Sequence, residues 1–216
     1  MLDAAIGALE ALHVGRDCNA APVADDGGGI AGGLLEVRHE QPGATLARSG
    51  VSMMWAVGID PGRKGAMVAL SMDDEVLVYR SRLAAGWRSD QERHEAWLEL
   101  LREVGGSASI GLVWVELQHV RHGQRGQVAH VREAGMWCGW AVSWGLRLEE
   151  RRASGNDGWR AAAGLGPRAG KQDVLELVAR RLPNLDLAPG RLRVPHMGIV
   201  DAAGIALGAR SHWRRS

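Results

Sequence analysis

The sequence predicts an α/β fold: a mixed five-stranded sheet, three antiparallel strands and then parallel strands, with helices on both faces. Three short strand-like runs separated by tight turns come first, over residues 55–60, 66–71 and 75–80. Beyond residue 90, helical periodicity alternates with two further candidate strands. Strands joined by tight turns pair antiparallel, whereas strands joined through a helix pair in parallel, so this order predicts one mixed sheet.

The first strands and the first helix follow from local patterns. WAVGID (55–60) is a short apolar run, as expected of a buried strand, and it ends in a carboxylate, Asp60. AMVALS (66–71) and EVLVYR (75–80) flank a tight polar turn and complete an antiparallel meander with it. The stretch 90–104 places apolar residues at helical spacing, so we expect a helix there.

The second half of the chain alternates strands and helices. SIGLVWVE (109–116) is another apolar run, and it too ends in a carboxylate, Glu116. After it we expect a helix over 126–145, a strand over 146–152, a short helix ending at 163, and helices over 171–182 and 200–210. Asp201 is expected in the first turn of the last helix.

Length and composition indicate one folded domain with an N-terminal appendage. The chain has 216 residues, and ADDGGGIAGG (24–33) has the composition of a flexible linker. No clear periodicity precedes Gly50. We therefore expect residues 1–52 to form a flexible extension and residues 53–216 to form the folded domain.

Cysteine content and hydropathy exclude several classes of protein. Cys18 and Cys138 are too few for a disulfide framework or a cysteine-based zinc site, and they fit a reducing cytoplasm. No stretch approaches the roughly 20 apolar residues of a membrane span. The N-terminus carries Asp3 and Glu10 and lacks the basic region of a secretory signal. The sequence therefore favours a cytoplasmic protein.

Charge is distributed unevenly along the chain. The net charge is +1 at pH 7, yet residues 151–216 contain 12 basic and 5 acidic residues. A basic final third favours an anionic partner, of which nucleic acid is the usual one, although a solvated surface gives the same composition. Charge alone therefore leaves both interpretations open.

Three acids occupy comparable places in the predicted fold. Asp60 ends the first strand, Glu116 ends the fourth, and Asp201 opens the last helix. If the two strands are adjacent and parallel, both carboxylates lie at one sheet edge, and a helix packed on that edge brings Asp201 beside them. Crowded carboxylates repel and are costly to bury unpaired, and Mg²⁺ or Mn²⁺ relieves both problems. Taken singly, the acids could be a turn former, a solvated strand end and a first-turn helix acid.

Three motifs occur around these acids, in the same order. They are AVGIDPGRKGAMVAL (56–70), VWVELQH (113–119) and GIVDAAGIAL (198–207). Together they resemble the RuvC-type Holliday junction resolvases of the RNase H-like superfamily, and most of all the phage and bacterial RuvC-like branch. GWRAAAGL (158–165) and GKQDVLELVARRLP (170–183) also resemble that branch. The resemblance covers about residues 54–212.

The resemblance implies an RNase H-like nuclease domain over residues 53–216 and a homodimeric, Mg²⁺-dependent endonuclease, with Mn²⁺ as a substitute. Such an enzyme resolves Holliday junctions in the bacterial or phage-infected cell, hydrolysing phosphodiesters of branched DNA by two-metal-ion catalysis. Two ions about 3.5–4 Å apart can clamp the attacking and leaving oxygens. The resemblance also implies Asp60, Glu116 and Asp201 as catalytic metal ligands.

The chain departs from the family at the usual fourth ligand, an Asp or His about one turn before the last Asp. Gly198 stands three residues before Asp201, and His196 is the nearest candidate for a fourth catalytic ligand. His196 could reach the site if the last helix starts at about Ile199. An earlier start would turn it away, because five residues correspond to a rotation of some 140° on a helix.

Basic residues near the motifs are candidate DNA contacts. Some follow Asp60 directly, some lie in the loop HVRHGQRGQ (119–127), and some flank the glycine-rich GLGPRAG (164–170) before a helix N-terminus, which suits an anion. The candidates are Arg63, Lys64, His119, Arg121, Arg125, Arg160, Arg168 and Lys171. For the loop residues, an exposed polar loop is the alternative.

Two other functions stay open. The departure at Gly198 motivates a catalytically inactive RuvC-like DNA-binding protein. A sugar kinase or actin-like ATPase also has a phosphate loop that follows a strand ending in Asp. Against this class, 216 residues hold one such domain, and the sequence shows no second phosphate loop.

Overall fold

The computed structural model describes four segments of the chain, residues 53–81, 86–117, 127–190 and 192–216. All four belong to one compact unit. The extension predicted over residues 1–52 lies outside the described residues, so the boundary expected at residue 53 stays a prediction. In the described segments, no helix has the length and apolar character needed to cross a membrane.

The described strands form one mixed sheet of order β3-β2-β1-β4-β5. The strands are β1 (Trp55–Ile59), β2 (Ala66–Ser71), β3 (Val76–Arg80), β4 (Ile110–Glu116) and β5 (Leu148–Arg151). β2 pairs antiparallel with both β1 and β3. β4 pairs in parallel with both β1 and β5. The predicted mixed five-stranded sheet is therefore confirmed, with its antiparallel meander and its parallel half.

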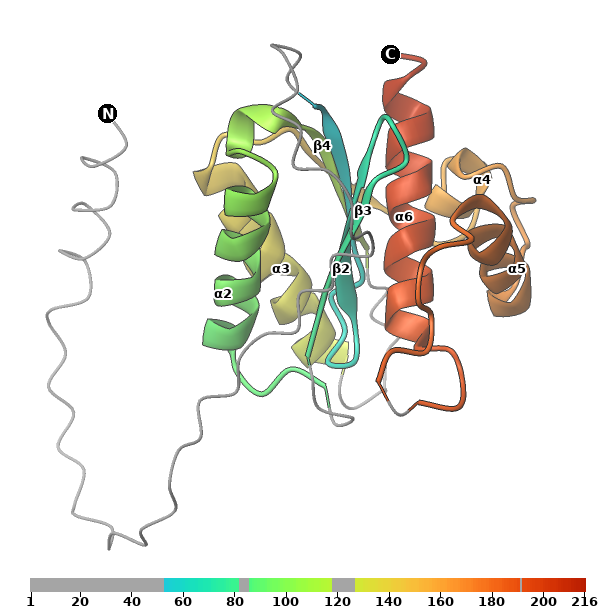
Figure 1. The fold of residues 1–216 in the computed structure, drawn as a ribbon, viewed down its shortest axis with the longest axis horizontal. Helices are drawn as coiled ribbons and strands as arrows, with labels where there is room; N and C mark the ends of the chain where they lie inside the picture. Colours follow the sequence, from blue (N-terminus) through green and yellow to red (C-terminus); the bar gives the residue numbers. More distant parts are fainter. Residues whose placement is uncertain (1–52, 82–85, 118–126, 191) are drawn as a thin grey trace, which may run out of the picture. The chain divides into compact units, whose positions relative to one another are not determined.

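Helices cover both faces of this sheet, as predicted (Figure 1). They are α2 (Asp90–Glu103), α3 (Gln127–Ser143), α4 (Trp159–Ala162), α5 (Lys171–Arg181) and α6 (Met197–Trp213), with a short 3-10 helix (Ser107–Ser109) before β4. The helices α2 and α3 pack on one face around the buried side chains of Trp97 and Trp137. On the other face α6 lies against the sheet, and α4 and α5 pack onto α6.

The last helix starts earlier than the sequence suggested. It begins at Met197, and its N-cap is His196, whose Nδ1 accepts a hydrogen bond from the backbone N–H of Ile199 at 3.3 Å. Asp201 therefore lies in the second turn of α6, and the expectation of a first-turn position was wrong. The sequence signal for the start of this helix was weak, because the usual N-cap residues Ser, Thr, Asp and Asn are absent from residues 190–200.

Small residues bring α6 close to β1. An ideal Cβ built on Gly58 would overlap the backbone oxygen of Ala202 and the backbone nitrogen of Ala206. The strand and the helix are therefore in backbone-to-backbone contact at this point, with no room for a side chain between them. This contact fixes the height of α6 along β1, and it holds the first turns of α6 near the residue that follows the strand, Asp60.

We expect Gly58→Ala to lower the free energy of unfolding by about 1–3 kcal/mol, because the added methyl group forces backbone away from backbone. Gly139→Ala is the matched control. An ideal Cβ on Gly139 meets nothing within 4 Å, so alanine in the middle of α3 should raise stability by about 0.5–1 kcal/mol. Urea unfolding measures both. Wild-type stability of Gly58→Ala would contradict the close contact of β1 and α6.

Candidate active site

Asp60 and Glu116 occupy neighbouring positions at the carboxyl ends of the two central strands. In the parallel pairing of β1 with β4, Ile59 lies opposite Val115. Asp60 directly follows β1, and Glu116 is the last residue of β4. The first and fourth strands are therefore adjacent and parallel, which is the condition under which both acids lie at one sheet edge.

Asp60 also closes the turn into β2. Its backbone N–H donates to the carbonyl of Ala66 at 3.0 Å, and its Oδ1 accepts from the backbone N–H of Gly62 at 3.2 Å. Within the described residues, Oδ2 has no hydrogen-bond partner. The turn-forming interpretation of this acid therefore holds for one oxygen and leaves the other available to a ligand.

Glu116 and Asp201 each have one close polar neighbour, a tryptophan and a lysine respectively. The indole Nε1–H of Trp159, at the start of α4, donates to Oε1 of Glu116 at 3.4 Å. Lys171, the first residue of α5, places Nζ 3.9 Å from Oδ2 of Asp201. Asp201 is only 8% exposed, and its Oδ1 is buried without a hydrogen-bond partner among the described residues. Such an atom is costly unless it finds a partner.

Burial raises the pKa of all three acids, and neighbouring acids raise the pKa of Asp60 and of Glu116 further. Burial and then the charges of Glu116 and Asp201 raise the pKa of Asp60 to about 7, against an ordinary value of 3.8. Burial and the Asp201 charge raise the pKa of Glu116. Burial raises the pKa of Asp201, while Lys171 and Arg160 oppose that shift. The fold thus brings the three predicted carboxylates within electrostatic reach of one another, at a cost to their ionised forms.

The donor chemistry at this edge fits a hard divalent cation, although the side chains do not converge on one. Three carboxylates are the ligands that Mg²⁺ and Mn²⁺ prefer, and the unpartnered Oδ1 of Asp201 is a ready ligand atom. As they stand, no three His, Cys, Asp or Glu side chains in the described segments are arranged to hold a metal ion. Mutual repulsion keeps ionised carboxylates apart, so Asp60, Glu116 and Asp201 would have to rotate together around a cation.

The place of the usual fourth ligand is closed to any side chain. An ideal Cβ on Gly198 would overlap the carbonyl oxygen of Lys64, so the start of α6 packs directly on the β1–β2 turn. Because α6 begins before Ile199, the condition under which His196 would reach the acids is not met. Burial and the charges of Arg80 and Lys64 lower the pKa of His196, and its Nδ1 is engaged in the cap. A ligand role for His196 stays a prediction.

The predicted DNA contacts fall into three groups. Arg63 and Lys64 are exposed in the turn after Asp60, and Arg168 is exposed between α4 and α5. Arg160 donates to the carbonyl of Ala169 at 2.7 Å and stacks over the ring of Trp159. Like Lys171, it lies within electrostatic reach of Asp201, whose pKa both residues lower. His119, Arg121 and Arg125 lie outside the described residues. All eight contacts stay predictions.

The anion site expected at the N-terminus of α5 is partly occupied by the protein itself. Asp173 accepts a hydrogen bond from the backbone N–H of Gly170 at 2.6 Å. Its carboxylate therefore satisfies one of the N–H groups that a phosphate would use. The side chain of Lys171, which is 68% exposed, remains the more accessible anion contact at this helix end.

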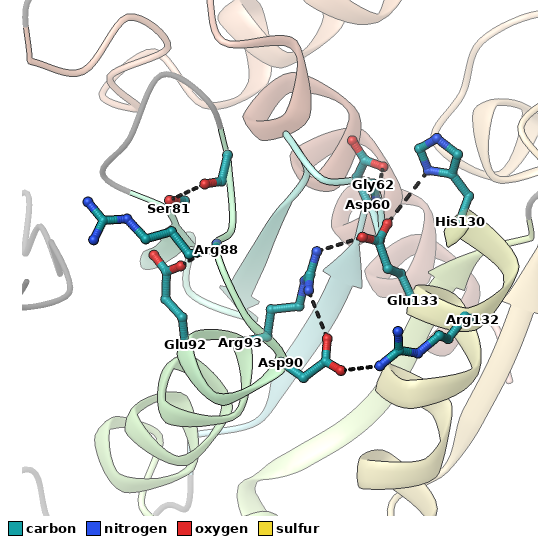
Figure 2. Close-up of polar contacts among 11 residues, drawn as sticks. Asp60, Gly62, Ser81, Arg88, Asp90, Glu92, Arg93, His130, Arg132 and Glu133 are labelled. Carbon is teal, nitrogen blue, oxygen red and sulfur yellow. Dashed lines mark hydrogen bonds and ion pairs between the residues drawn. The ribbon is translucent and has the colours of Figure 1, made fainter. Parts of the chain in front are cut away.

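Sequence reasoning missed a histidine beside the Asp60 turn. An ideal Cβ on Gly62 would lie 3.4 Å from Oδ1 of Asp60 and 3.7 Å from Nδ1 of His130, in the first turn of α3. Nδ1 of His130 lies 3.7 Å from Oε2 of Glu133 (Figure 2). The i,i+3 spacing of His130 and Glu133 on the predicted helix was the available signal, although no local pattern related that helix face to Asp60.

Comparisons with known proteins match the chain at the level of solved structures. Neither family models nor curated proteins match it. The structure of Thermus thermophilus RuvC is 24% identical and covers 75% of this chain and 96% of its own, with a TM-score of 0.47. T. thermophilus RuvC in complex with a Holliday junction substrate is 23% identical and covers 76% and 97%, with a TM-score of 0.46. These values assign neither a family nor an activity.

We expect Asp60→Asn to stabilise the metal-free protein at alkaline pH. The raised pKa of Asp60 means that its contribution to stability is present below its ordinary value of 3.8 and is lost as the pH rises through about 7. Asparagine does not ionise, so the variant does not lose this stability as the pH rises. In EDTA at pH 8, Asp60→Asn should therefore melt several degrees above wild type, since 1 kcal/mol corresponds to about 2–4 °C in a domain of this size.

Thermal melts from pH 4 to pH 8 measure this difference. It should be small at pH 4 and grow toward pH 8. Asp73→Asn, in the exposed β2–β3 turn, is the control that changes one acid outside the site. A difference in melting temperature between Asp60→Asn and wild type that does not change with pH would contradict the electrostatic cost of ionising Asp60.

Proposed function

We propose that the chain is a structure-selective endonuclease that hydrolyses phosphodiesters of branched DNA, four-way junctions included, by two-metal-ion catalysis. The observation that carries the proposal is the gathering of Asp60, Glu116 and Asp201 at one sheet edge. They come from three separate motifs, and each motif resembles the corresponding motif of the RuvC-type resolvases. An acid cluster maintained at such an electrostatic cost favours a cation-dependent reaction over a structural role.

The proposed roles follow from the position of each group. Asp60, Glu116 and Asp201 would hold Mg²⁺, which stabilises the negative charge of the phosphate in the transition state. The Trp159 indole orients Glu116 through its hydrogen bond. Lys171, now 3.9 Å from Asp201, can turn to a phosphate oxygen when a cation takes over that carboxylate.

DNA binding is the second part of the proposal. Arg63 and Lys64 on one side of the acids, and Arg160, Arg168 and Lys171 on the other, would contact phosphates of the strands that flank the cleaved bond. Contacts of this kind position the duplex and carry no sequence information. Their contribution to affinity falls as the salt concentration rises, because binding releases counterions from DNA.

A catalytically inactive RuvC-like DNA-binding protein is the second candidate. The closed position at Gly198 and the carboxylates that do not converge favour it. A labelled four-way junction incubated with Mg²⁺, Mn²⁺ and Ca²⁺ in parallel separates the two candidates. Cleavage in Mg²⁺ or Mn²⁺ supports the endonuclease, whereas binding without cleavage in every metal supports the inactive protein.

Asp60→Asn should reduce junction cleavage in Mg²⁺ at least about 10²-fold, because a neutral amide is a poor ligand for a hard cation. Junction affinity in Ca²⁺ should stay within about twofold of wild type. Gel assays of cleavage and of binding measure the two quantities, with Asp73→Asn as the control. Full cleavage by Asp60→Asn would show that Asp60 is not a metal ligand.

A homodimer is the third part of the proposal, and α3 offers a surface for it. Val128, Val131 and Val142 are exposed by 76%, 43% and 64%. Together with the exposed Gly135 and Gly139 they form an uncharged stripe along the helix. The spacing of the five residues is symmetric about Gly135. An antiparallel copy of α3 would therefore place each valine opposite a member of the same stripe, as a two-fold axis requires.

Gly135→Arg should convert the dimer to a monomer without unfolding it. An ideal Cβ on Gly135 meets nothing within 4 Å, so the monomer accommodates the side chain, while the new charge lies at the centre of the proposed interface. Sedimentation velocity measures the change. Ala179→Arg, on the exposed side of α5, is the control that adds the same charge elsewhere. A dimeric Gly135→Arg protein would contradict the interface, and a monomeric wild type would contradict the dimer.

A further inference from the structure

His130 lies next to the candidate active site, on an element that carries none of the predicted acids. The empty space above Gly62 separates its ring from Asp60, since one ideal Cβ position lies 3.4 Å from Oδ1 of Asp60 and 3.7 Å from Cε1 of His130. The side chain of His130 is 45% exposed, whereas its Nδ1 is buried. Because Nδ1 is the buried atom and faces Glu133, the exposed part of the ring is the side that carries Nε2.

A buried arginine holds the carboxylate that faces His130. Arg93 has a side chain that is 5% exposed. It donates to Asp90 of its own helix at 3.0 Å, and it bridges α2 and α3 by donating to Oε1 of Glu133 at 2.7 Å (Figure 2). Arg132 also pairs with Asp90, at 2.6 Å. Breaking such a buried pair is costly, so the position of Glu133 is well determined.

The remaining oxygen of Glu133 faces the buried nitrogen of His130. Oε2 and Nδ1 are 3.7 Å apart, and both are buried without a hydrogen-bond partner among the described residues. Two unpartnered atoms that face each other at this distance need a small movement to form a hydrogen bond, and catalytic hydrogen bonds are often this long before substrate binds. The pair is therefore arranged as a carboxylate–imidazole dyad.

The dyad decides which nitrogen of His130 can accept a proton. A carboxylate beside Nδ1 keeps a proton on that nitrogen, so the lone pair of the neutral ring lies on Nε2, the solvent-facing atom. The same carboxylate stabilises the imidazolium that forms when Nε2 takes up a proton. His94 and His212 differ from it, since they stack on Trp140 and Trp114.

We propose that His130 accepts the proton of the attacking water in the phosphodiester hydrolysis, and that Glu133 is its positioning residue. The inference rests on the proposed endonuclease function. The water loses one proton to Nε2, and its oxygen forms a bond to phosphorus. The bond from phosphorus to the leaving deoxyribose oxygen breaks, its electron pair stays on that oxygen, and the oxygen takes a proton from solvent. The imidazolium then returns its proton to solvent.

Single-turnover cleavage of a labelled four-way junction by the full chain tests the role of His130. His130→Ala should lower the rate about 10²-fold or more, the usual contribution of a general base. Junction affinity and the Mn²⁺ affinity, measured by calorimetry, should not change. His94→Ala removes a histidine from the same face of the sheet but away from Asp60, and it should cleave at the wild-type rate.

Chemical rescue separates a proton acceptor from a structural residue. Added imidazole should restore part of the rate of His130→Ala, because it can occupy the vacated space beside Glu133. Glu133→Gln should lower the rate, and imidazole should fail to rescue the double variant His130→Ala, Glu133→Gln, because nothing then orients the base.

Three outcomes would overturn the inference. Cleavage at the wild-type rate by His130→Ala would show that His130 is not the proton acceptor, while the proposed endonuclease activity would stand. A loss of Mn²⁺ affinity in His130→Ala would make the residue a metal ligand instead. Absence of cleavage by the wild type in every metal would overturn the endonuclease and this inference together.

Discussion

The backbone contact between β1 and α6 is the constraint on which the rest of the structure depends. Gly58 lets the strand touch the helix at Ala202 and Ala206, and Gly198 lets the first turn of the helix touch the β1–β2 turn at Lys64. These two contacts set both the distance and the height of α6 relative to the central strands. As a result Asp201 lies beside the ends of β1 and β4. A larger residue at Gly58 or Gly198 would push α6 away from the strands and displace Asp201.

The same close packing makes the acid cluster electrostatically expensive. Burial contributes most to the raised pKa of each of the three acids, and neighbouring acids raise two of them further. The described residues offset this cost only in part, through Lys171, Arg160, the Trp159 indole and one backbone N–H. A site of this kind is more stable with a cation than without one, so metal affinity and folding stability are coupled here.

A second polar network joins the helices of the opposite face to the same edge. Arg93 connects α2 to α3 through Glu133, Asp90 connects them through Arg132, and Glu133 faces His130 beside the Asp60 turn. Because the arginine is buried, the network can position a side chain as firmly as apolar packing does. Residues that lie 70 positions apart in the sequence, Asp60 and His130, thus meet at one surface.

The sequence by itself determined the order of strands and helices along the chain, the mixed sheet with helices on both faces, and the three acids as candidates, because apolar periodicity and the three motifs are local signals. It did not determine the start of α6, since His196 is an uncommon N-cap and Gly198 has no side chain to mark its contact. Nor did it relate His130 to Asp60. Those results depend on how far β1, α3 and α6 approach one another, and only tertiary packing sets that distance.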